Sequence, residues 1–322
     1  MKPKQSSEKP TKVQYIIVDQ AFTGQRLDNF LMARLKGVPR SRIYRMVRGG
    51  EVRVNKKRVG PFYRVQEKDS IRIPPVQLGE QAAIVPPSEK TQALLTKRIL
   101  YEDEQLIILN KPSGMSVHGG STVRIGVIEA LRTMYPKSPH LELAHRLDSD
   151  TSGCLILAKK RSVLRELHTL LREGGVRKIY LALTKGQWKP AEYRVDVPLQ
   201  KYHLKGGERL VKVHHEGKAS LTVFHPETFY NQATLVEVHL YTGRTHQIRV
   251  HAQYTGHPLA GDERYGEAEF NQFMEKKGLK RLFLHAKSIE FVLPSNGKRI
   301  YIEAPLDEDL KEVLKQLEKE QL

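Results

Sequence analysis

The chain has 322 residues, of which 39% are hydrophobic and 28% charged, with a mean hydropathy of −0.49. No apolar run approaches the ~18 residues of a membrane-spanning helix, and the single cysteine, Cys154, excludes an internal disulfide framework or a multi-cysteine metal site. Lysine and arginine exceed aspartate and glutamate by 18, and residues 1–87 alone hold 18 basic and 7 acidic residues. This clustering argues against a general solubility role and makes nucleic acid the first expected partner.

The first 13 residues are charged and lack the apolar run of a secretory signal, so they are predicted to form a mobile tail of a cytoplasmic protein. Residues 14–75 follow as a small domain. The spacing of its apolar residues predicts a helix over 26–35 and a second over 41–48, which Ser41 caps and Gly49 ends. Two short strands, EVRVN and SIRIP, complete this domain.

The second of these helices turns Ile43, Met46 and Val47 inward and keeps its arginines outward. Arginines along one exposed helix face can contact successive phosphates of structured RNA, although a solvated face is the alternative. The pattern of residues 26–59 resembles the small α/β S-four-like RNA-binding domain. The residues expected to contact RNA here are Arg26, Arg40, Arg42, Arg45, Arg48, Lys56, Lys57 and Arg58.

Two Pro-Pro pairs between residues 74 and 90 predict a linker, which we place at 76–96. Residues 97–322 then change in character and predict a second, larger α+β domain. Its expected strands are LIILN, LELAH, CLILA, KIYLAL, TLVEVHLY, RLFLHAKSIEFVL and RIYIEAP, and its expected helices are GVIEALRTMY, VLRELHTLLREGG and the C-terminal DEDLKEVLKQLEKEQ. The leucines of the second helix are expected in the core.

A polar loop, residues 144–153, stands between two of the predicted strands and is dense in reactive groups. A serine hydrolase reading fails because Gly-x-Ser-x-Gly is absent. A metal site is disfavoured because His246 and His251 are five residues apart and would lie on different faces of a helix. The glycines of HGGS, residues 118–121, could cradle a phosphate, but such turns are common.

Four ordered motifs resemble those of the RluA-type pseudouridine synthases: KPSGMSVHGG, HRLDSDTSG, VRKIYLAL and YTGRTHQIRVHAQYTGHPLAGDERYG. The resemblance implies a catalytic domain with a mixed, largely antiparallel central sheet. It also implies isomerisation of uridine to pseudouridine within RNA, with large-subunit (23S) ribosomal RNA, as precursor or free RNA, as the substrate. It implies a reaction without cofactor or metal. We infer no protein partner, and the hydropathy described above predicts no membrane association.

Carried over residue by residue, the resemblance makes Asp148 the catalytic aspartate, Tyr180 the aromatic residue that meets the base, and Arg244 the ion-pair partner of Asp148. His145 and Arg146 beside the aspartate are expected to contact RNA. Gly243 and Thr245, as turn residue and helix cap, would aim Arg244 at the carboxylate. The alternatives are a core role for Tyr180, a phosphate contact for Arg244, and a non-catalytic assembly factor or an RNA hydrolase for the whole chain.

Overall fold

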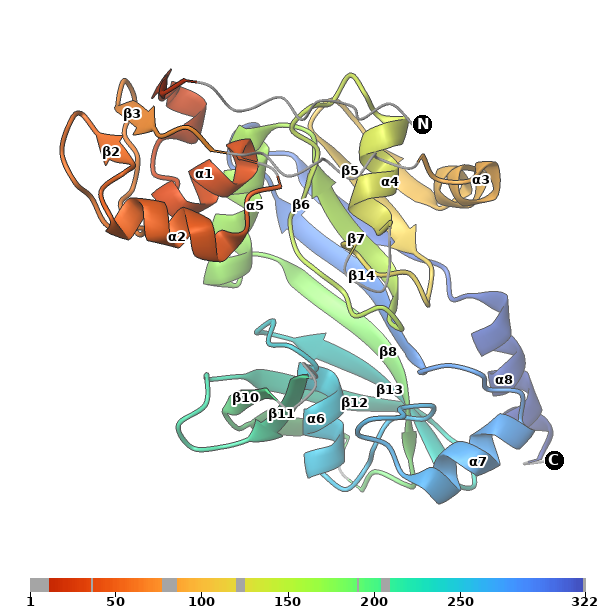
Figure 1. Ribbon diagram of the computed structural model, residues 1–322. Coiled ribbons are helices and arrows are strands. Elements are labelled where there is room, and N and C mark those ends of the chain that lie inside the picture. Colours follow the sequence, from red (N-terminus) through yellow and green to blue (C-terminus); the bar gives the residue numbers. More distant parts are fainter. Residues whose placement is uncertain are drawn as a thin grey trace, which may run out of the picture. The chain divides into compact units, whose positions relative to one another are not determined.

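The computed structural model describes residues 12–35, 37–76, 86–119, 125–189, 191–203 and 209–320. Its contacts divide the chain into two units, Met1–Val85 and Pro86–Leu322. Figure 1 draws the first unit in red to orange and the second from light orange through yellow and green to blue. Each unit is described by itself. Across the described ranges, no helix has both the length and the apolar character needed to cross a bilayer.

The N-terminal unit packs two helices against one face of a small sheet. Its elements are β1 (Gln14–Ile17), η1 (Gln20–Phe22), α1 (Leu27–Arg34), α2 (Arg40–Arg48), β2 (Arg53–Val54) and β3 (Ser70–Ile73). The three strands are antiparallel in the order β1-β3-β2. Phe30, Ile43, Met46 and Ile71 are fully buried between the layers. The helices and two of the strands were predicted, whereas β1 was not.

Helix α2 begins one residue earlier than predicted, at Arg40, with Pro39 at its N-cap and no side-chain capping bond. The expected Ser41 cap is therefore wrong, because Ser41 already lies inside the first turn. A buried carboxylate links the two helices instead. Asp28 of α1 accepts hydrogen bonds from Tyr44 of α2 and from Arg26, both at 2.6 Å.

The expected linker, 76–96, is too long at its C-terminal end. Helix α3 (Glu89–Lys97) occupies that part, and Ser88 caps it by accepting a bond from the Thr91 amide at 3.2 Å. Leu95 is fully buried and anchors α3 in the core of the second unit. Residues 77–85 of the expected linker lie outside the described residues.

The C-terminal unit is built on a ten-stranded sheet, with the main order β4-β5-β7-β14-β8-β13-β12-β9, β15 beside β14 and β6 beside β7. The strands are β4 (Ile99–Glu102), β5 (Leu106–Lys111), β6 (Glu142–Leu143), β7 (Ser152–Ala158), β8 (Arg177–Lys185), β9 (Tyr193–Asp196), β12 (Leu221–Phe229), β13 (Ala233–Leu240), β14 (Leu284–Val292) and β15 (Arg299–Glu303). A separate hairpin joins β10 (Leu199–His203) to β11 (Arg209–Val213). The mixed, largely antiparallel α+β fold is thereby confirmed.

Besides α3, the described part of this unit contains the helices α4 (Val127–Met134), α5 (Arg161–Glu173), α6 (Gln247–Tyr254), α7 (Ala268–Lys276) and α8 (Glu308–Lys319). In α5, Leu167 is fully buried, while Leu164, Leu170 and Leu171 are half-buried and pack against the core. The helix ends at Gly174, whose φ of 80° is left-handed.

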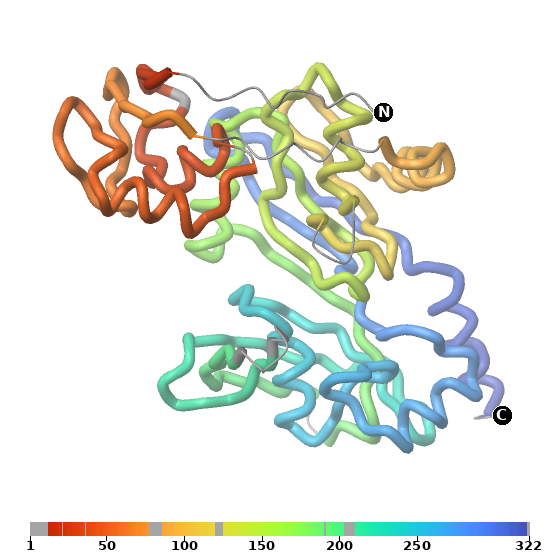
Figure 2. The backbone as a smooth tube through the Cα atoms, in the orientation of Figure 1, coloured from red at the N-terminus to blue at the C-terminus, as the bar shows by residue number. Residues whose placement is uncertain are grey.

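Among the strand pairs found in the described residues of this sheet, β7 with β14 is the parallel one, and it positions the polar loop. These strands lie side by side although they are far apart in sequence (Figures 1 and 2). Gly153 pairs with Ala286 at a φ of 106°, and a Cβ there would lie 2.3 Å from the Ala286 carbonyl oxygen. Ser152 and His285 are hydrogen-bonded across the same pair at 2.9 Å. The loop that ends at Thr151 is therefore fixed directly to the centre of the sheet.

Candidate active site

A buried lysine holds the loop that carries Asp148. Lys111 ends β5, and its Nζ donates to the carbonyls of Pro112, Met115 and Ser149, each at 2.8 Å. Burial lowers the pKa of Lys111 to about 7, against the attraction of Asp150 and Asp148. Thus the KPSGM segment, the first part of one of the four sequence motifs, holds the loop in place through the hydrogen bonds of Lys111.

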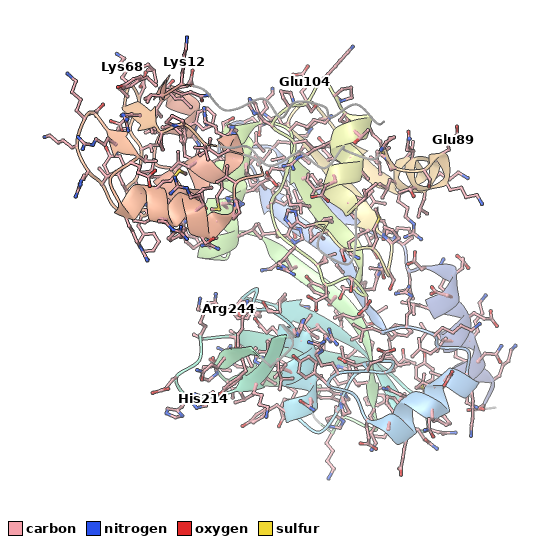
Figure 3. The ribbon with its side chains drawn as sticks, viewed as in Figure 1. Lys12, Lys68, Glu89, Glu104, His214 and Arg244 are labelled. Atoms are coloured by element: carbon pink, nitrogen blue, oxygen red, sulfur yellow. The ribbon has the colours of Figure 1, made fainter. Side chains whose placement is uncertain are left out.

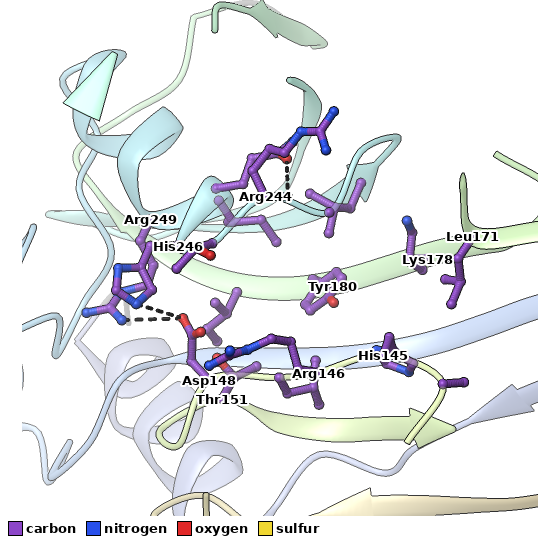
Figure 4. A pocket seen from close by; sticks show the side chains of 18 of the residues that line it. His145, Arg146, Asp148, Thr151, Leu171, Lys178, Tyr180, Arg244, His246 and Arg249 are labelled. Carbon is purple, nitrogen blue, oxygen red and sulfur yellow. Dashed lines mark hydrogen bonds and ion pairs between the residues drawn. The ribbon is translucent and has the colours of Figure 1, made fainter. Parts of the chain in front are cut away.

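The side chain of Asp148 lines a pocket of about 390 Å³ (Figure 4). Of the described residues that line it, Asp148 is the only one with a carboxylate. The lining also includes His145, Arg146, Tyr180, Arg244, His246 and Arg249. The loop, β8 and α6 each contribute part of this wall, so segments that span more than a hundred residues of sequence meet around one carboxylate.

Arg249 on α6 is the ion-pair partner of Asp148, with 3.5 Å between its Nη1 and Asp148 Oδ2. The same guanidinium donates two hydrogen bonds of 2.7 Å to the carboxylate of buried Asp262. Burial opposes ionisation of Asp262, but Arg249 and two backbone amides outweigh it and hold the pKa of Asp262 below its usual value. Asp262 therefore fixes a permanent cation beside Asp148.

The expected ion pair between Arg244 and Asp148 is not formed. Arg244 Nε donates to the Ala219 carbonyl at 3.0 Å, and its side chain extends away from Asp148 (Figure 4). The physical reason is where α6 begins: Arg244 stands in the turn before the helix, whereas Arg249 lies on the buried side of its first turns. Sequence reasoning missed Arg249, although a lone arginine among apolar helix residues was a usable signal.

Thr245 does not cap α6 either. The N-cap is His246, in a left-handed conformation with φ of 52° and without a side-chain capping bond. Buried Gln247 stabilises the turn instead. Its Oε1 accepts from the Arg244 amide and the Thr242 hydroxyl, and its Nε2 donates to the Leu221 carbonyl and Thr222 Oγ1, all within 3.0 Å. The turn is thus fastened to β12.

His246 presents its ring to Asp148, with 3.8 Å between Nε2 and Oδ2. Burial lowers the pKa of His246 more than Asp148 raises it, so the ring is neutral at pH 7. We assign the proton to Nε2, because a carboxylate repels a bare nitrogen lone pair. Tyr265 Oη, which accepts from the Val211 amide, then donates to Nδ1 at 2.8 Å.

Tyr180 lies on β8 with its ring in the pocket wall and 7% of its surface exposed. Burial, followed by the charge of Asp148, raises the pKa of Tyr180, which keeps its hydroxyl protonated. His145 lines the same pocket, but its Nε2 accepts the Ile156 amide at 3.1 Å, and burial lowers its pKa to about 4. Arg146 is exposed at the mouth.

The basic residues predicted to contact RNA in the first unit fall into two groups. Arg45, Arg48 and the turn of Lys56, Lys57 and Arg58 are exposed. The other arginines already have partners: Arg26 pairs with Asp28, Arg42 with Glu51, and Arg40 donates to Tyr44. Their roles toward RNA stay predictions.

His246 and His251 do not form a metal pair, because His251 is buried against Thr222, Ser220 and Val197. Within the described ranges, one group has ligand atoms close enough for a metal ion, namely His214, His215 and Glu216, which lie within 4.8 Å of one another. His214 extends from the surface of the second unit (Figure 3) and is no part of the pocket around Asp148.

The sequence and fold place the chain in a known family. Residues 105–254 match the model of the RNA pseudouridylate synthase family, and residues 25–71 match the S4 domain. The chain is 54% identical over 310 residues to "Ribosomal large subunit pseudouridine synthase C" of Salmonella typhi and 53% identical to the protein of that name in Escherichia coli K12. Both alignments cover 95% of this chain and 96% of the relative. The chain therefore belongs to the pseudouridine synthase family, and it is an isomerase.

Solved structures agree with this assignment. The human protein "RNA Pseudouridylate Synthase Domain Containing 4" is 25% identical, with a TM-score of 0.59 over 71% of this chain and 96% of that one. A second human protein, "RNA Pseudouridylate Synthase Domain Containing 1", shares the fold, with a TM-score of 0.54 over 65% of this chain and 82% of that one.

Proposed function

We propose that the protein converts uridines of large-subunit ribosomal RNA to pseudouridine, with Asp148 as nucleophile. The observation that carries this proposal is the pocket of about 390 Å³, in which the Asp148 carboxylate lies beside the cation of Arg249 and shares a wall with the Tyr180 ring. The names of its bacterial relatives support the choice of RNA.

The reaction breaks the bond between uracil N1 and ribose C1′ and joins C5 to C1′, so that C5 loses a proton and N1 gains one. The product has the same atoms as the substrate, so the reaction needs no oxidant or reductant. Asp148 attacks as a carboxylate. Arg249 places a cation beside the carboxylate and orients it, and Nε2 of His246 faces the same oxygen.

Tyr180 supplies the face on which the flipped uracil stacks. Taking a base out of its stack costs a few kcal/mol, and contact with an aromatic ring returns about 1–3 kcal/mol per base. Because its hydroxyl stays protonated, Tyr180 meets the base as a neutral hydrogen-bonding group. Arg244, His145 and Arg146 line the same pocket, where Arg146 and Arg244 can bind the phosphates that flank the flipped nucleotide.

The exposed basic residues of the first unit hold the surrounding RNA through its phosphates. We place the reaction on precursor or free large-subunit RNA in the cytoplasm, because a base must leave its stack before it can enter the pocket, and RNA folded into a ribosome resists this.

Mapping of pseudouridines in large-subunit RNA tests this function in cells with and without the gene. Specific sites are expected to be lost in the deletion strain and restored by the wild-type gene but not by Asp148→Asn. The purified protein should modify free large-subunit RNA faster than assembled ribosomal particles. An unchanged map in the deletion strain would contradict the proposal.

A further inference from the structure

The small sheet of the N-terminal unit has one face that none of the helices in the described part of this unit covers. In its antiparallel register, Tyr15 of β1 lies opposite Arg72 of β3, which lies opposite Arg53 of β2. Directly opposed residues point to the same face, with neighbouring Cα atoms about 4.5–5.5 Å apart. A tyrosine and two arginines therefore form one row across all three strands.

Burial separates the two faces of this sheet. Val54, Ile71 and Ile73 point into the core with α1 and α2 and are at most 2% exposed. On the opposite face, Tyr15 is 67% exposed and its neighbour Ile17 is 62% exposed. These two exposed side chains form a small apolar patch on the open face.

The row lies in a groove of about 770 Å³, lined by Tyr15, Gly50, Arg53, Asn55, Lys56, Ser70 and Arg72. This volume falls within the ~300–1,000 Å³ of typical ligand sites. The arginines are held in place by backbone: Arg72 Nη1 donates to the Glu51 carbonyl at 2.7 Å, and Arg53 Nε donates to the Gly50 carbonyl at 3.3 Å. Their heads are therefore partly ordered before any ligand binds.

The charge of the groove is of one sign. No carboxylate appears in its described lining, and none of the ion pairs found in the described part of the chain involves Arg53, Lys56 or Arg72. Two acids of this unit already have partners: Glu51 pairs with Arg42, and buried Asp69 accepts from Asn55 and Tyr63. Three cations beside an open aromatic ring suit an unpaired nucleotide, whose phosphates bind the cations while its base stacks on the ring.

We propose that this open face, the Tyr15–Arg72–Arg53 row with Lys56, is a second RNA-contact surface that binds a single-stranded segment of the RNA substrate by base stacking on Tyr15. It is distinct from the helix arginines Arg45 and Arg48 and rests on the proposed RNA substrate. An acidic protein segment is the competing occupant, which the test below separates.

The test measures binding of the full chain to a short fluorescent oligouridine and to a short RNA duplex. Tyr15→Leu should weaken oligouridine binding by about 5- to 150-fold, because stacking is lost, and leave duplex binding within about twofold. Tyr15→Phe should bind like wild type. Arg53→Gln with Arg72→Gln should reduce the salt slope for oligouridine by about 0.7 for each phosphate that is no longer bound.

The matched control is Arg299→Gln with Tyr301→Leu on β15, an exposed arginine and tyrosine of which the arginine already pairs with Glu290. It should change neither affinity. Photo-crosslinking of 4-thiouridine RNA to the wild-type chain should mark residues 14–17 or 70–73.

Unchanged oligouridine affinity in Tyr15→Leu, or the absence of crosslinks in both segments, would overturn the proposal. A competition experiment with an oligoglutamate peptide of equal charge gives a further test. If the peptide displaced the labelled oligouridine as strongly as unlabelled RNA does, the face would be a site for an acidic protein segment and the proposal would be overturned. Turnover of wild type on large-subunit RNA is measured in parallel, so failure of the proposed function would show as absent turnover while oligouridine binding still reports on Tyr15.

Discussion

At the scale of single residues, the site brings one carboxylate and one fixed cation together in a partly enclosed pocket. Asp148 has 20% of its side chain exposed, and its cation, Arg249, is held by Asp262 rather than by Asp148 itself. This division of contacts leaves Asp148 accessible to a substrate while its counter-charge stays in place.

Asp148→Asn keeps the shape of the side chain and removes its nucleophilic charge. We expect turnover to fall by at least ~10³-fold with RNA affinity nearly unchanged. Tritium release from RNA labelled at uridine C5 measures this. Asp150→Asn, an exposed aspartate of the same loop, is the control and should retain activity. Similar losses in both variants would contradict the assignment.

Arg249→Lys and Arg244→Lys test which arginine serves Asp148. A lysine at 249 cannot keep both bonds to Asp262, so the free energy of unfolding should fall by about 1.5–3 kcal/mol and the single-turnover rate by at least ~30-fold. A lysine at 244 keeps the charge, and we expect weaker RNA binding with a rate within about threefold of wild type. If Arg244→Lys were instead the slower variant, the result would support the ion pair between Arg244 and Asp148 that the sequence predicts.

Stability should depend on pH through two histidines, His145 in the pocket wall and the buried His251. Burial lowers the pKa of His145 and of His251 to about 4 from an unfolded value near 6.5. Between these two pKa values the unfolded chain binds more protons than the folded chain. The contribution of each histidine to the free energy of unfolding is therefore fully present above pH 6.5 and is lost as the pH falls toward 4, by on the order of 3 kcal/mol for each histidine. Urea unfolding followed by the single, buried Trp188 measures this, and His251→Asn should flatten the profile.

At the scale of elements, the site rests on the β7–β14 pair, because β7 follows the loop directly. Close approach of the two strands requires a residue without a side chain at Gly153. The contact between these strands therefore determines where the loop ends.

Gly153→Ala places a Cβ against the Ala286 backbone at a left-handed φ, and we expect a loss of about 3 kcal/mol or more together with reduced activity. Gly174→Ala is the matched control. Its φ is also left-handed, but a Cβ would meet nothing within 4 Å, so the cost should be only ~1 kcal/mol. Unfolding followed by Trp188 fluorescence compares them, and equal losses would show that the strand contact is not limiting.

At the scale of the whole molecule, charge and chemistry are carried by different parts of the chain. The first unit has its own buried cluster, between Val18 and Ile73, and the clusters of the second unit share no residue with it. Residues 1–87 contribute 11 of the net 18 positive charges, whereas all residues around the pocket of Asp148 belong to the second unit.

Removal of residues 1–85 should therefore leave a folded second unit with the Trp188 fluorescence of the full chain. We expect weaker binding to large-subunit RNA and a shallower salt dependence, by about 0.7–0.9 for each phosphate that the first unit would otherwise bind. Titration at several salt concentrations measures the slope. An unchanged slope would show that the clustered charge of the first unit does not contact RNA.

The sequence by itself determined the elements with strong periodicity, such as α5 and β5, the basic N-terminal domain and the Asp148 loop, because these depend on neighbours in the chain. Only the tertiary structure decided that Arg249, and not Arg244, is the ion-pair partner of Asp148. Asp148 and Arg249 are 101 residues apart in the sequence. In addition, the five residues between positions 244 and 249 change the direction in which an arginine side chain points. It likewise decided the roles of Lys111 and the exposure of Tyr15. Contacts between distant segments are set by packing of the whole core, which no local pattern of residues encodes.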